Sequence, residues 1–328
     1  MTSYRVALIG AGIIARNHLD ALSQLQELTA SAVADTNEVK GRQIANEYGI
    51  THYLDYKEMV VKERPDIVII ALPHHLHEPC AVWCAKQGCH LLLEKPMALN
   101  LAECDAILEA VAASNVKLMV GHTQHYRAAN LQAKELITSG RLGKLIAIHD
   151  TRHVYYYDEG RPAWFFEKEK AGGGILMNLG AHSIDKIQWL TGSRVKSVRA
   201  SLSYEGAFGD VEGSGCILLQ TTSNVTAVII QSGYEGVAKD ETELIFSNGM
   251  AKLISAKGLW VSKGGQYEQV QSIVHDDPFV MQFKDLLQAI QYEQDPDSSG
   301  KYARSVITVL EAVYHSDEKG VEISVEPK

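Results

Sequence analysis

The sequence predicts an α/β protein in which a doubly wound parallel sheet precedes an α+β domain with an open-faced, mainly antiparallel sheet. In residues 1–122, short apolar runs alternate with stretches of helical periodicity, the pattern of a parallel sheet wound with helices. Between residues 123 and 270 the apolar period changes to two, which is typical of antiparallel strands. At 328 residues the chain is too long for one ordinary core, so we predict two domains, 1–122 and 123–328.

Local patterns predict each element of the first domain. Apolar runs of strand length are bounded by turn residues, and helical stretches place apolar residues three and four apart. Asn100 before Leu101-Ala102-Glu103 predicts a helix cap with a capping-box acid at Glu103. We predict strands near 4–9, 28–34, 66–72, 89–94 and 117–121, and helices near 13–25, 37–47, 57–63, 78–87 and 100–114.

Two hairpins are predicted in the second domain. Cys216–Gln220 and Val225–Ser232 flank a turn at Ser223-Asn224, and Glu241–Phe246 and Met250–Ile254 flank Asn248-Gly249. The chain is expected to close with helices at 279–293 and 301–315 and a strand from Val321 to Val325. One face of this sheet is a candidate subunit interface, so we expect a homo-oligomer, a dimer or tetramer formed through the second-domain sheet.

Composition narrows the classes of partner and compartment. The 40 acidic against 31 basic side chains argue against nucleic acid and anionic membrane as partners. Five scattered cysteines do not form a disulfide framework, and no apolar run reaches membrane-spanning length. The first strand begins so close to Met1 that a signal peptide has no room. We therefore expect a cytoplasmic protein with reduced thiols.

The turn after the first strand predicts a dinucleotide site. Gly10-x-Gly12-x-x-Ala15 follows an apolar strand and opens a helix, so Gly10 permits the tight turn and Gly12 lets a pyrophosphate approach the backbone. The free N–H groups and the positive end of the helix dipole then face the phosphates. We therefore assign Gly10, Gly12, Ile13 and Ile14 to cofactor binding.

Asp35, at the end of the second strand, has two interpretations. Its carboxylate can accept both hydroxyls of the adenine ribose and would repel a 2′-phosphate, and no arginine follows to bind such a phosphate. These features favour NAD over NADP. The alternative is an Asp that caps the next helix, and both roles can hold at once.

The loop after the strand at 66–72 contains several histidines and cysteines. His74, His75, His77, Cys80 and Cys84 match no metal-motif spacing, and two prolines interrupt the segment, so we predict no metal site. Open α/β sheets place ligands at the carboxyl ends of their strands. We therefore assign Leu72, Pro73 and His77 to cofactor binding.

Lys95 in Glu94-Lys95-Pro96 ends a buried strand on the ligand side of the sheet. Burying an ammonium is costly, so a lysine at this position is unusual as packing material. Desolvation and a positive nicotinamide ring would lower the pKa of Lys95 toward the working pH, as proton transfer requires. The alternative is an ordinary surface lysine at a strand end. We predict catalysis by Lys95 and cofactor contacts from Glu94 and Lys95.

These motifs together resemble the glucose–fructose oxidoreductase / inositol dehydrogenase / MocA family. The resemblance rests on Gly10-x-Gly12, Asp35, Pro73…His77, Glu94-Lys95-Pro96 and the segment from Gly172-Gly173-Gly174 through Asn178 and His182 to Asp185. It implies an NAD(P)-dependent oxidoreductase with a Rossmann domain and an open-faced sheet domain. The lysine of the family triplet falls on Lys95, and the catalytic histidine falls on His182.

Asn178 departs from the family pattern, which has an Asp four residues before the histidine. An amide can orient a histidine or a sugar hydroxyl, but it cannot share a proton or stabilise imidazolium as a carboxylate does. We therefore expect Asn178 to orient, and Lys95 and His182 to carry the proton chemistry. Without the resemblance, the sequence favours the interpretation of His182 as a structural helix histidine.

Helical periodicity places Asn178, His182, Asp185 and Trp189 on one face. The opposite, buried face is expected to hold Leu179, Ile184, Ile187 and Leu190. The triple glycine before this helix suits a close backbone approach or a mobile entry.

Polar and aromatic residues near the start of the second domain are candidates for substrate binding. Aromatic faces with polar tips suit a polyol ring, and they suit an oligomer interface equally well. The candidates are Gln124, His125 and Arg127 past the junction, and His153, Tyr155 and Trp164 in the segment that begins His153-Val154-Tyr155-Tyr156-Tyr157.

We therefore expect hydride transfer between NAD and a secondary alcohol or ketone carbon of a sugar, cyclitol or sugar derivative. In the oxidation direction, Lys95 or His182 takes the hydroxyl proton. The alternative is a non-catalytic protein that senses NAD(P) on the same fold. Lys95 favours the enzyme, and Asn178 favours the sensor.

Overall fold

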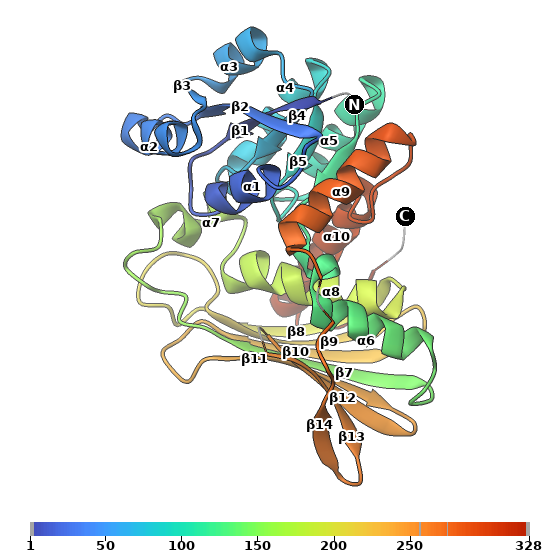
Figure 1. Ribbon diagram of the computed structural model, residues 1–328. Helices are drawn as coiled ribbons and strands as arrows, with labels where there is room; N and C mark the ends of the chain where they lie inside the picture. Colours follow the sequence, from blue (N-terminus) through green and yellow to red (C-terminus); the bar gives the residue numbers. More distant parts are fainter. Residues whose placement is uncertain (1–2, 256, 274, 326–328) are drawn as a thin grey trace. The chain divides into compact units, whose positions relative to one another are not determined.

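The computed structural model describes residues 3–255, 257–273 and 275–325 (Figure 1). The chain divides into two compact units, Met1–Thr123 with Asp276–Arg304, and Gln124–His275 with Ser305–Lys328. The sequence-based division differs in one respect, because it placed all of 276–304 in the second domain. This segment returns to the first unit because the apolar face of its helix is buried in the first core.

The first unit is built on a parallel sheet with strand order β3-β2-β1-β4-β5-β6. The middle strands are fully buried in runs such as Ile67–Ile70, as expected where helices cover both faces. The short third strand was not predicted. The strands are β1 (Tyr4–Ile9), β2 (Leu28–Ala34), β3 (Thr51–Tyr53), β4 (Ile67–Ile70), β5 (His90–Leu93) and β6 (Leu118–Val120).

Side-chain caps mark the start of several helices of the first unit. The predicted cap at Asn100 is confirmed, because Asn100 accepts from the Glu103 N–H at 3.0 Å. Glu103 reaches back as predicted for a capping-box acid, but it accepts from the Leu99 N–H at 3.0 Å instead of the Asn100 N–H. The helices are α1 (Ala15–Leu22), α2 (Glu38–Tyr48), α3 (Tyr56–Glu63), α4 (His77–Lys86), α5 (Leu101–Ala113) and α9 (Pro278–Gln291), with a 3-10 turn η1 (His74–Leu76). Helix α9 packs on α1 and adds Val280, Phe283 and Leu286 to the core.

The second unit is built on a sheet with strand order β14-β13-β12-β11-β7-β10-β9-β8-β15. Both predicted hairpins are confirmed, as β9 pairs with β10 and β11 with β12, both antiparallel. The pairing of β10 with β7 is parallel. The strands are β7 (Leu145–His153), β8 (Val195–Ser203), β9 (Ser214–Thr221), β10 (Thr226–Ser232), β11 (Lys239–Phe246), β12 (Gly249–Ile254), β13 (Gly258–Lys263), β14 (Gln266–Gln269) and β15 (Ile323–Ser324).

Helices α6 and α8 lie over one face of this second sheet (Figure 1). Helix α10 (Gly300–Lys319) begins in the first unit and continues in the second. The other helical segments are η2 (Thr123–Tyr126), α6 (Ala128–Thr138), η3 (Ala163–Phe166), α7 (Lys168–Ala171), the π-helical turn η4 (Leu176–Gly180) and α8 (Ala181–Thr191).

The π-helical turn corrects the face predicted for residues 178–190. Asn178 lies in η4 and is buried, whereas Leu179 is partly exposed, the reverse of the expected pattern. A π-turn holds more residues than an α-turn, so it rotates the side chains before it relative to those after it. A uniform period of 3.6 residues therefore fails across this segment.

Within the described ranges, no helix has both the length and the apolar composition needed to cross a bilayer. All five cysteines carry free thiols; Cys216 is exposed and the other four are buried.

Candidate active site

The predicted cofactor residues of the first unit lie at the carboxyl ends of its parallel strands. Gly10 follows β1, Asp35 follows β2, Leu72 follows β4, and Lys95 follows β5. The chain winds outward in both directions from β1 and β4, so the strand order reverses between them. Open α/β sheets bind ligands at such a reversal.

The glycine-rich turn has the geometry of a backbone anion site. Gly10 has a φ of +102°, and a Cβ there would lie 2.2 Å from the Ala71 carbonyl oxygen, so only glycine fits. Around Gly12, no described atom comes within 4 Å of the position of a Cβ, and Ile13 is 89% exposed. The turn therefore leaves room for a diphosphate at the start of α1.

Asp35 is held by two backbone donors. The Ala11 N–H donates to Oδ2 and the Asn37 N–H donates to Oδ1, both at 2.7 Å. Asp35 is not the cap of α2, because Asn37 caps that helix by accepting from the Lys40 N–H at 3.1 Å. Of the two interpretations of Asp35, the cap is therefore wrong, and ribose binding stays a prediction.

A cavity of about 370 Å³ opens beside Asp35. Its walls are mostly apolar, and Asp35 contributes a carboxylate, which together suit an adenosine with its purine against apolar surface and its ribose at the acid. Leu72 and Pro73 line it as predicted. Sequence reasoning missed the remaining walls, which come from Ile9, Ala34, Thr36, Leu54, Tyr56, Leu76, Pro79 and Cys80.

His77 joins two loops at this edge of the sheet. Its buried ring lies between two carbonyl oxygens, with Nδ1 2.9 Å from Pro96 O and Nε2 2.9 Å from Leu72 O. Burial lowers the pKa of His77 and the two carbonyls oppose the drop, so the neutral ring donates to one of them at a time. Among the described side chains, no group of three or more His, Cys, Asp or Glu is placed to hold a metal ion.

Glu94 connects Lys95 to the first helix. His18 of α1 is fully buried and donates from Nε2 to Glu94 Oε1 at 2.8 Å, and its ring meets Phe279 edge-on. The Lys95 N–H donates to Glu94 Oε2 at 3.3 Å. Burial opposes ionisation of Glu94, but the hydrogen bond from His18 and the charge of Lys95 lower its pKa. Glu94 is therefore an ionised carboxylate next to Lys95. No sequence pattern predicted the contact of His18 with Glu94.

Asn178 and His182 belong to the second unit. Asn178 is 7% exposed and its N–H donates to the Gly174 carbonyl at 3.1 Å. Tyr156 is fully buried, which raises its pKa, and the Asn178 amide opposes this rise. Asn178 is thus next to a tyrosine hydroxyl, and His182 is partly exposed in the first turn of α8.

Asp185 and Trp189 of α8 both contact His125 of η2. Asp185 accepts from His125 Nε2 at 2.7 Å, and both side chains are fully buried. The His125 ring stacks on Trp189 with centroids 4.9 Å apart, and Lys134 Nζ lies 3.8 Å from the Trp189 ring centroid. The pair anchors η2 to α8 and is a structural feature of this unit.

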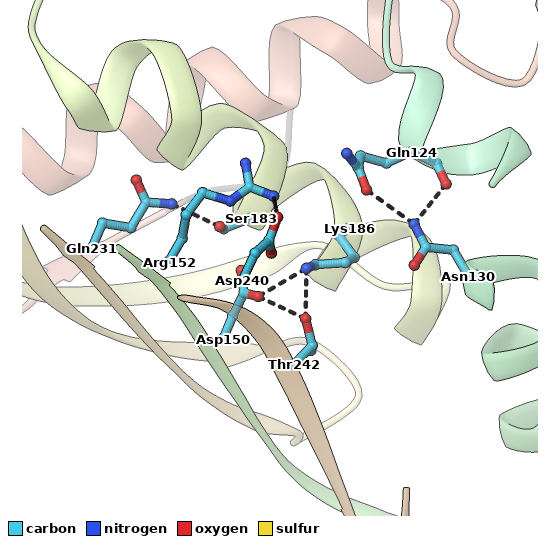
Figure 2. A network of polar contacts seen from close by, with 9 residues as sticks. All are labelled: Gln124, Asn130, Asp150, Arg152, Ser183, Lys186, Gln231, Asp240 and Thr242. Atoms are coloured by element: carbon cyan, nitrogen blue, oxygen red, sulfur yellow. Dashed lines mark hydrogen bonds and ion pairs between the residues drawn. The ribbon is translucent and has the colours of Figure 1, made fainter. Parts of the chain in front are cut away.

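A buried polar network holds α8 on the sheet (Figure 2). Lys186 Nζ donates to Asp150 Oδ1 at 2.8 Å and to Thr242 Oγ1 at 2.6 Å. Burial raises the pKa of Asp150, but Lys186 outweighs it and the net pKa is lowered. Gln231 Nε2 also donates to Ser183 Oγ at 2.8 Å. Contacts on this sheet-facing side fix the helix that carries His182, and no sequence pattern predicted them.

The residues predicted to bind substrate are dispersed within the second unit. Gln124 is buried and accepts two hydrogen bonds from the Asn130 amide (Figure 2). Arg127 is exposed at the start of α6, and His153 ends β7. Tyr155 is 52% exposed, and Trp164 stacks on Phe165 with centroids 3.8 Å apart. Tyr156 and Tyr157 belong to the core.

The parallel sheet, the open glycine turn and the carboxylate beside an apolar cavity define an NAD-binding Rossmann domain. The second unit adds a mainly antiparallel sheet. The chain belongs to the Gfo/Idh/MocA oxidoreductase family. Residues 4–122 match the family model described as "Oxidoreductase family, NAD-binding Rossmann fold", and residues 130–252 match "GFO/IDH/MocA C-terminal domain".

Named relatives cover the chain to different extents. The myo-inositol 2-dehydrogenase of Thermotoga maritima is 23% identical in an alignment of 336 positions that covers 98% of this chain and 98% of that relative. The 1-carboxy-3-chloro-3,4-dihydroxycyclo hexa-1,5-diene dehydrogenase of Comamonas testosteroni is 28% identical over 72% of this chain, and the match spans 60% of that relative's length.

A solved structure has the same fold over almost the whole chain. The aldose-aldose oxidoreductase from Caulobacter crescentus, complexed with glycerol, superimposes with a TM-score of 0.90 at 24% identity. The match covers 98% of this chain and 99% of that one. At this level of identity the likeness establishes the fold alone.

Proposed function

We propose that the protein is an NAD-dependent dehydrogenase acting on a secondary alcohol carbon of a sugar, cyclitol or sugar derivative. The observation that carries the proposal is the position of Lys95, which follows β5 at the ligand edge of the sheet. Strand ends around it that suit a dinucleotide support a role for this lysine in proton transfer, with desolvation and the nicotinamide charge opposing the ammonium form that Glu94 favours. Family membership and the named dehydrogenase relatives support the same class of reaction.

The residues of the first unit fit the cofactor. Gly12 and Ile13 would hold the diphosphate at the start of α1, and Asp35 would accept the ribose hydroxyls beside the apolar cavity. The carboxylate of Asp35 also favours NAD over NADP. Bound NAD supplies the acceptor for the hydride that leaves the alcohol carbon.

Proton transfer is the part of the reaction that the protein itself performs. In the oxidation direction, Lys95 or His182 takes the proton from the substrate hydroxyl, and in the reverse direction returns it. Asn178 has an amide where a carboxylate would stabilise imidazolium, so we expect the pKa of His182 to be lower than in an Asp-paired site if His182 takes the proton. Asn178, Gln124, Arg127, His153, Tyr155 and Trp164 remain candidates for orienting the substrate.

Turnover with a panel of polyols and sugars tests the proposal. Purified protein should reduce NAD with at least one polyol, sugar or cyclitol, and Lys95→Ala should lower kcat by about 10²–10⁴-fold. NADH affinity should stay within about twofold. Lys86→Ala, which removes an exposed lysine of the same unit, serves as the matched control and should keep wild-type turnover. Absence of turnover on the whole panel, together with a partner whose affinity changes when NAD binds, would establish the sensor instead.

A further inference from the structure

Glu212 is a buried carboxylate that lies just before β9 and contacts the glycine segment ahead of His182. It is 1% exposed. Its Oε2 accepts from the Gly174 N–H at 2.8 Å, and its Oε1 accepts from the Leu176 N–H at 2.9 Å. Its own carbonyl accepts from the Ile175 N–H at 3.2 Å. One residue thus binds three consecutive backbone donors where the helical segment begins.

Tyr314 of α10 completes the arrangement, because its hydroxyl donates to Glu212 Oε1 at 3.0 Å. Two glycines make this close approach possible. A Cβ at Gly173 would lie 1.9 Å from the Tyr314 hydroxyl, and one at Gly174 would lie 2.1 Å from the Glu212 carbonyl oxygen. Of the two roles expected for the triple glycine, the structure therefore supports the close backbone approach.

Glu212 holds the backbone that leads into the turns carrying Asn178 and His182. The first N–H groups of a helix have no partner within the helix, so an acceptor such as Glu212 fixes where the segment begins. Because the Asn178 N–H donates to the Gly174 carbonyl, a shift of Gly174 moves Asn178, and His182 follows one turn later. Burial raises the pKa of Glu212, and its hydrogen bonds oppose this rise.

We propose that Glu212, with Tyr314, is a positioning residue for Asn178 and His182. It acts through the backbone of Gly174 and Leu176 and makes no contact with substrate. The inference rests on the proposed function for its effect on turnover, but the placement of His182 can be measured without turnover.

Glu212→Gln is the sharpest test, because it keeps the shape of the side chain while replacing one acceptor oxygen with an NH₂ group. That group faces either the Gly174 or the Leu176 N–H, so one backbone donor must move away. The matched control is Asp317→Asn, since Asp317 also accepts a backbone N–H at 2.8 Å, but from Leu202 of β8.

Two readouts are compared in these variants. A displacement of about 1 Å near a reacting group can cost about 10²-fold, so we expect kcat to fall about 10–100-fold in Glu212→Gln. NADH affinity should be unchanged, because the cofactor residues belong to the first unit. The NMR titration of the His182 ring, assigned with His182→Gln, should shift in Glu212→Gln and match wild type in Asp317→Asn.

The outcomes separate this inference from the proposed function. If wild type turns over no polyol, the proposed function fails, and the His182 titration still decides whether Glu212 positions that ring. The inference is overturned if Glu212→Gln leaves the His182 titration unchanged, whether or not kcat falls. If Glu212→Gln does not fold, Tyr314→Phe removes one donor and keeps the ring, and the same titration decides with a smaller expected shift.

Discussion

Replacing Asp35 with Ser should reduce the preference of the protein for NADH over NADPH. In the structure both carboxylate oxygens accept backbone N–H groups at 2.7 Å, which holds the charge in place beside the cavity. A ribose hydroxyl can add to these donors, whereas a 2′-phosphate brings negative charge against negative charge. Serine retains a hydroxyl acceptor and removes the charge.

Coulomb's law gives the size of the effect. A phosphate that replaces a ribose hydroxyl within hydrogen-bond distance of Asp35 would lie about 4–5 Å from the carboxylate. One pair of unit charges at about 4 Å repels by about 1 kcal/mol in water and about 4 kcal/mol at an effective dielectric constant of about 20. Asp35 is partly exposed, so a net penalty of about 1.5–3 kcal/mol is reasonable. We therefore expect wild type to bind NADH about 10–150-fold more tightly than NADPH.

Fluorescence titration of NADH and NADPH measures both affinities directly. Asp35→Ser should bring the two dissociation constants to within about fivefold, because NADPH binding improves while NADH loses an acceptor. Glu38→Gln is the matched control, since it removes an exposed carboxylate of the first turn of α2 that pairs with Arg42. The ratio in wild type should fall at about 0.5 M salt, because the screening length there, about 4 Å, is comparable with the distance between the two charges.

Equal affinities in wild type would refute this reasoning, and so would an Asp35→Ser ratio equal to that of wild type. A change of the same size in Glu38→Gln would show that general charge, and not the position of Asp35, sets the preference.

Three further predictions use the second unit. Asn178→Asp should move the acidic limb of the kcat–pH profile up by about 1 pH unit if His182 carries the proton, because an added carboxylate stabilises imidazolium; an unmoved limb assigns the proton to Lys95. Asp150→Asn leaves the Lys186 ammonium buried without its partner, so urea unfolding at pH 7 should show a loss of about 3–5 kcal/mol. Burial raises the pKa of Asp150, but the effect of Lys186 is larger and the net pKa is lowered. The pair therefore stabilises the folded state above about pH 4, and this contribution is lost as the pH falls through the lowered pKa. A loss of unfolding free energy in Asp150→Asn that is just as large at pH 3 would contradict this. Ile230 lies on β10 with a side chain that is 43% exposed. If the open face of the sheet joins subunits, wild type should sediment as a dimer or tetramer and Ile230→Glu as a monomer. A wild-type monomer would contradict the expectation.

Local sequence determined most of the first unit. Strand and helix alternation, the glycine turn and the capping box at Asn100 each depend on residues close together in the chain. Gly10 could be predicted as the residue of the tight turn, because its positive φ is a backbone conformation that only glycine adopts readily. The hairpins of the second unit were predicted on the same basis, from turn residues between alternating runs.

Contacts between distant segments were decided by the tertiary structure. The return of α9 to the first core depends on which apolar surface was left uncovered by α1, and no local pattern records that. His18 meets Glu94 across 76 residues, and Lys186 meets Asp150 across 36. No sequence pattern predicts either of these two contacts, because each depends on a partner far away in the chain.

The turn that carries Asn178 shows most clearly what helical periodicity in the sequence cannot predict. The sequence by itself identified Asn178 and His182 as a pair four residues apart, but it implied a regular helix between them. The structure inserts a π-turn at 176–180 and holds its start with Glu212, which is 36 residues from Leu176. Helix periodicity is a property of the local backbone, so sequence can predict it. Where a helix begins and whether its pitch changes depend on which distant donors and acceptors must be satisfied, and only the folded chain brings those together.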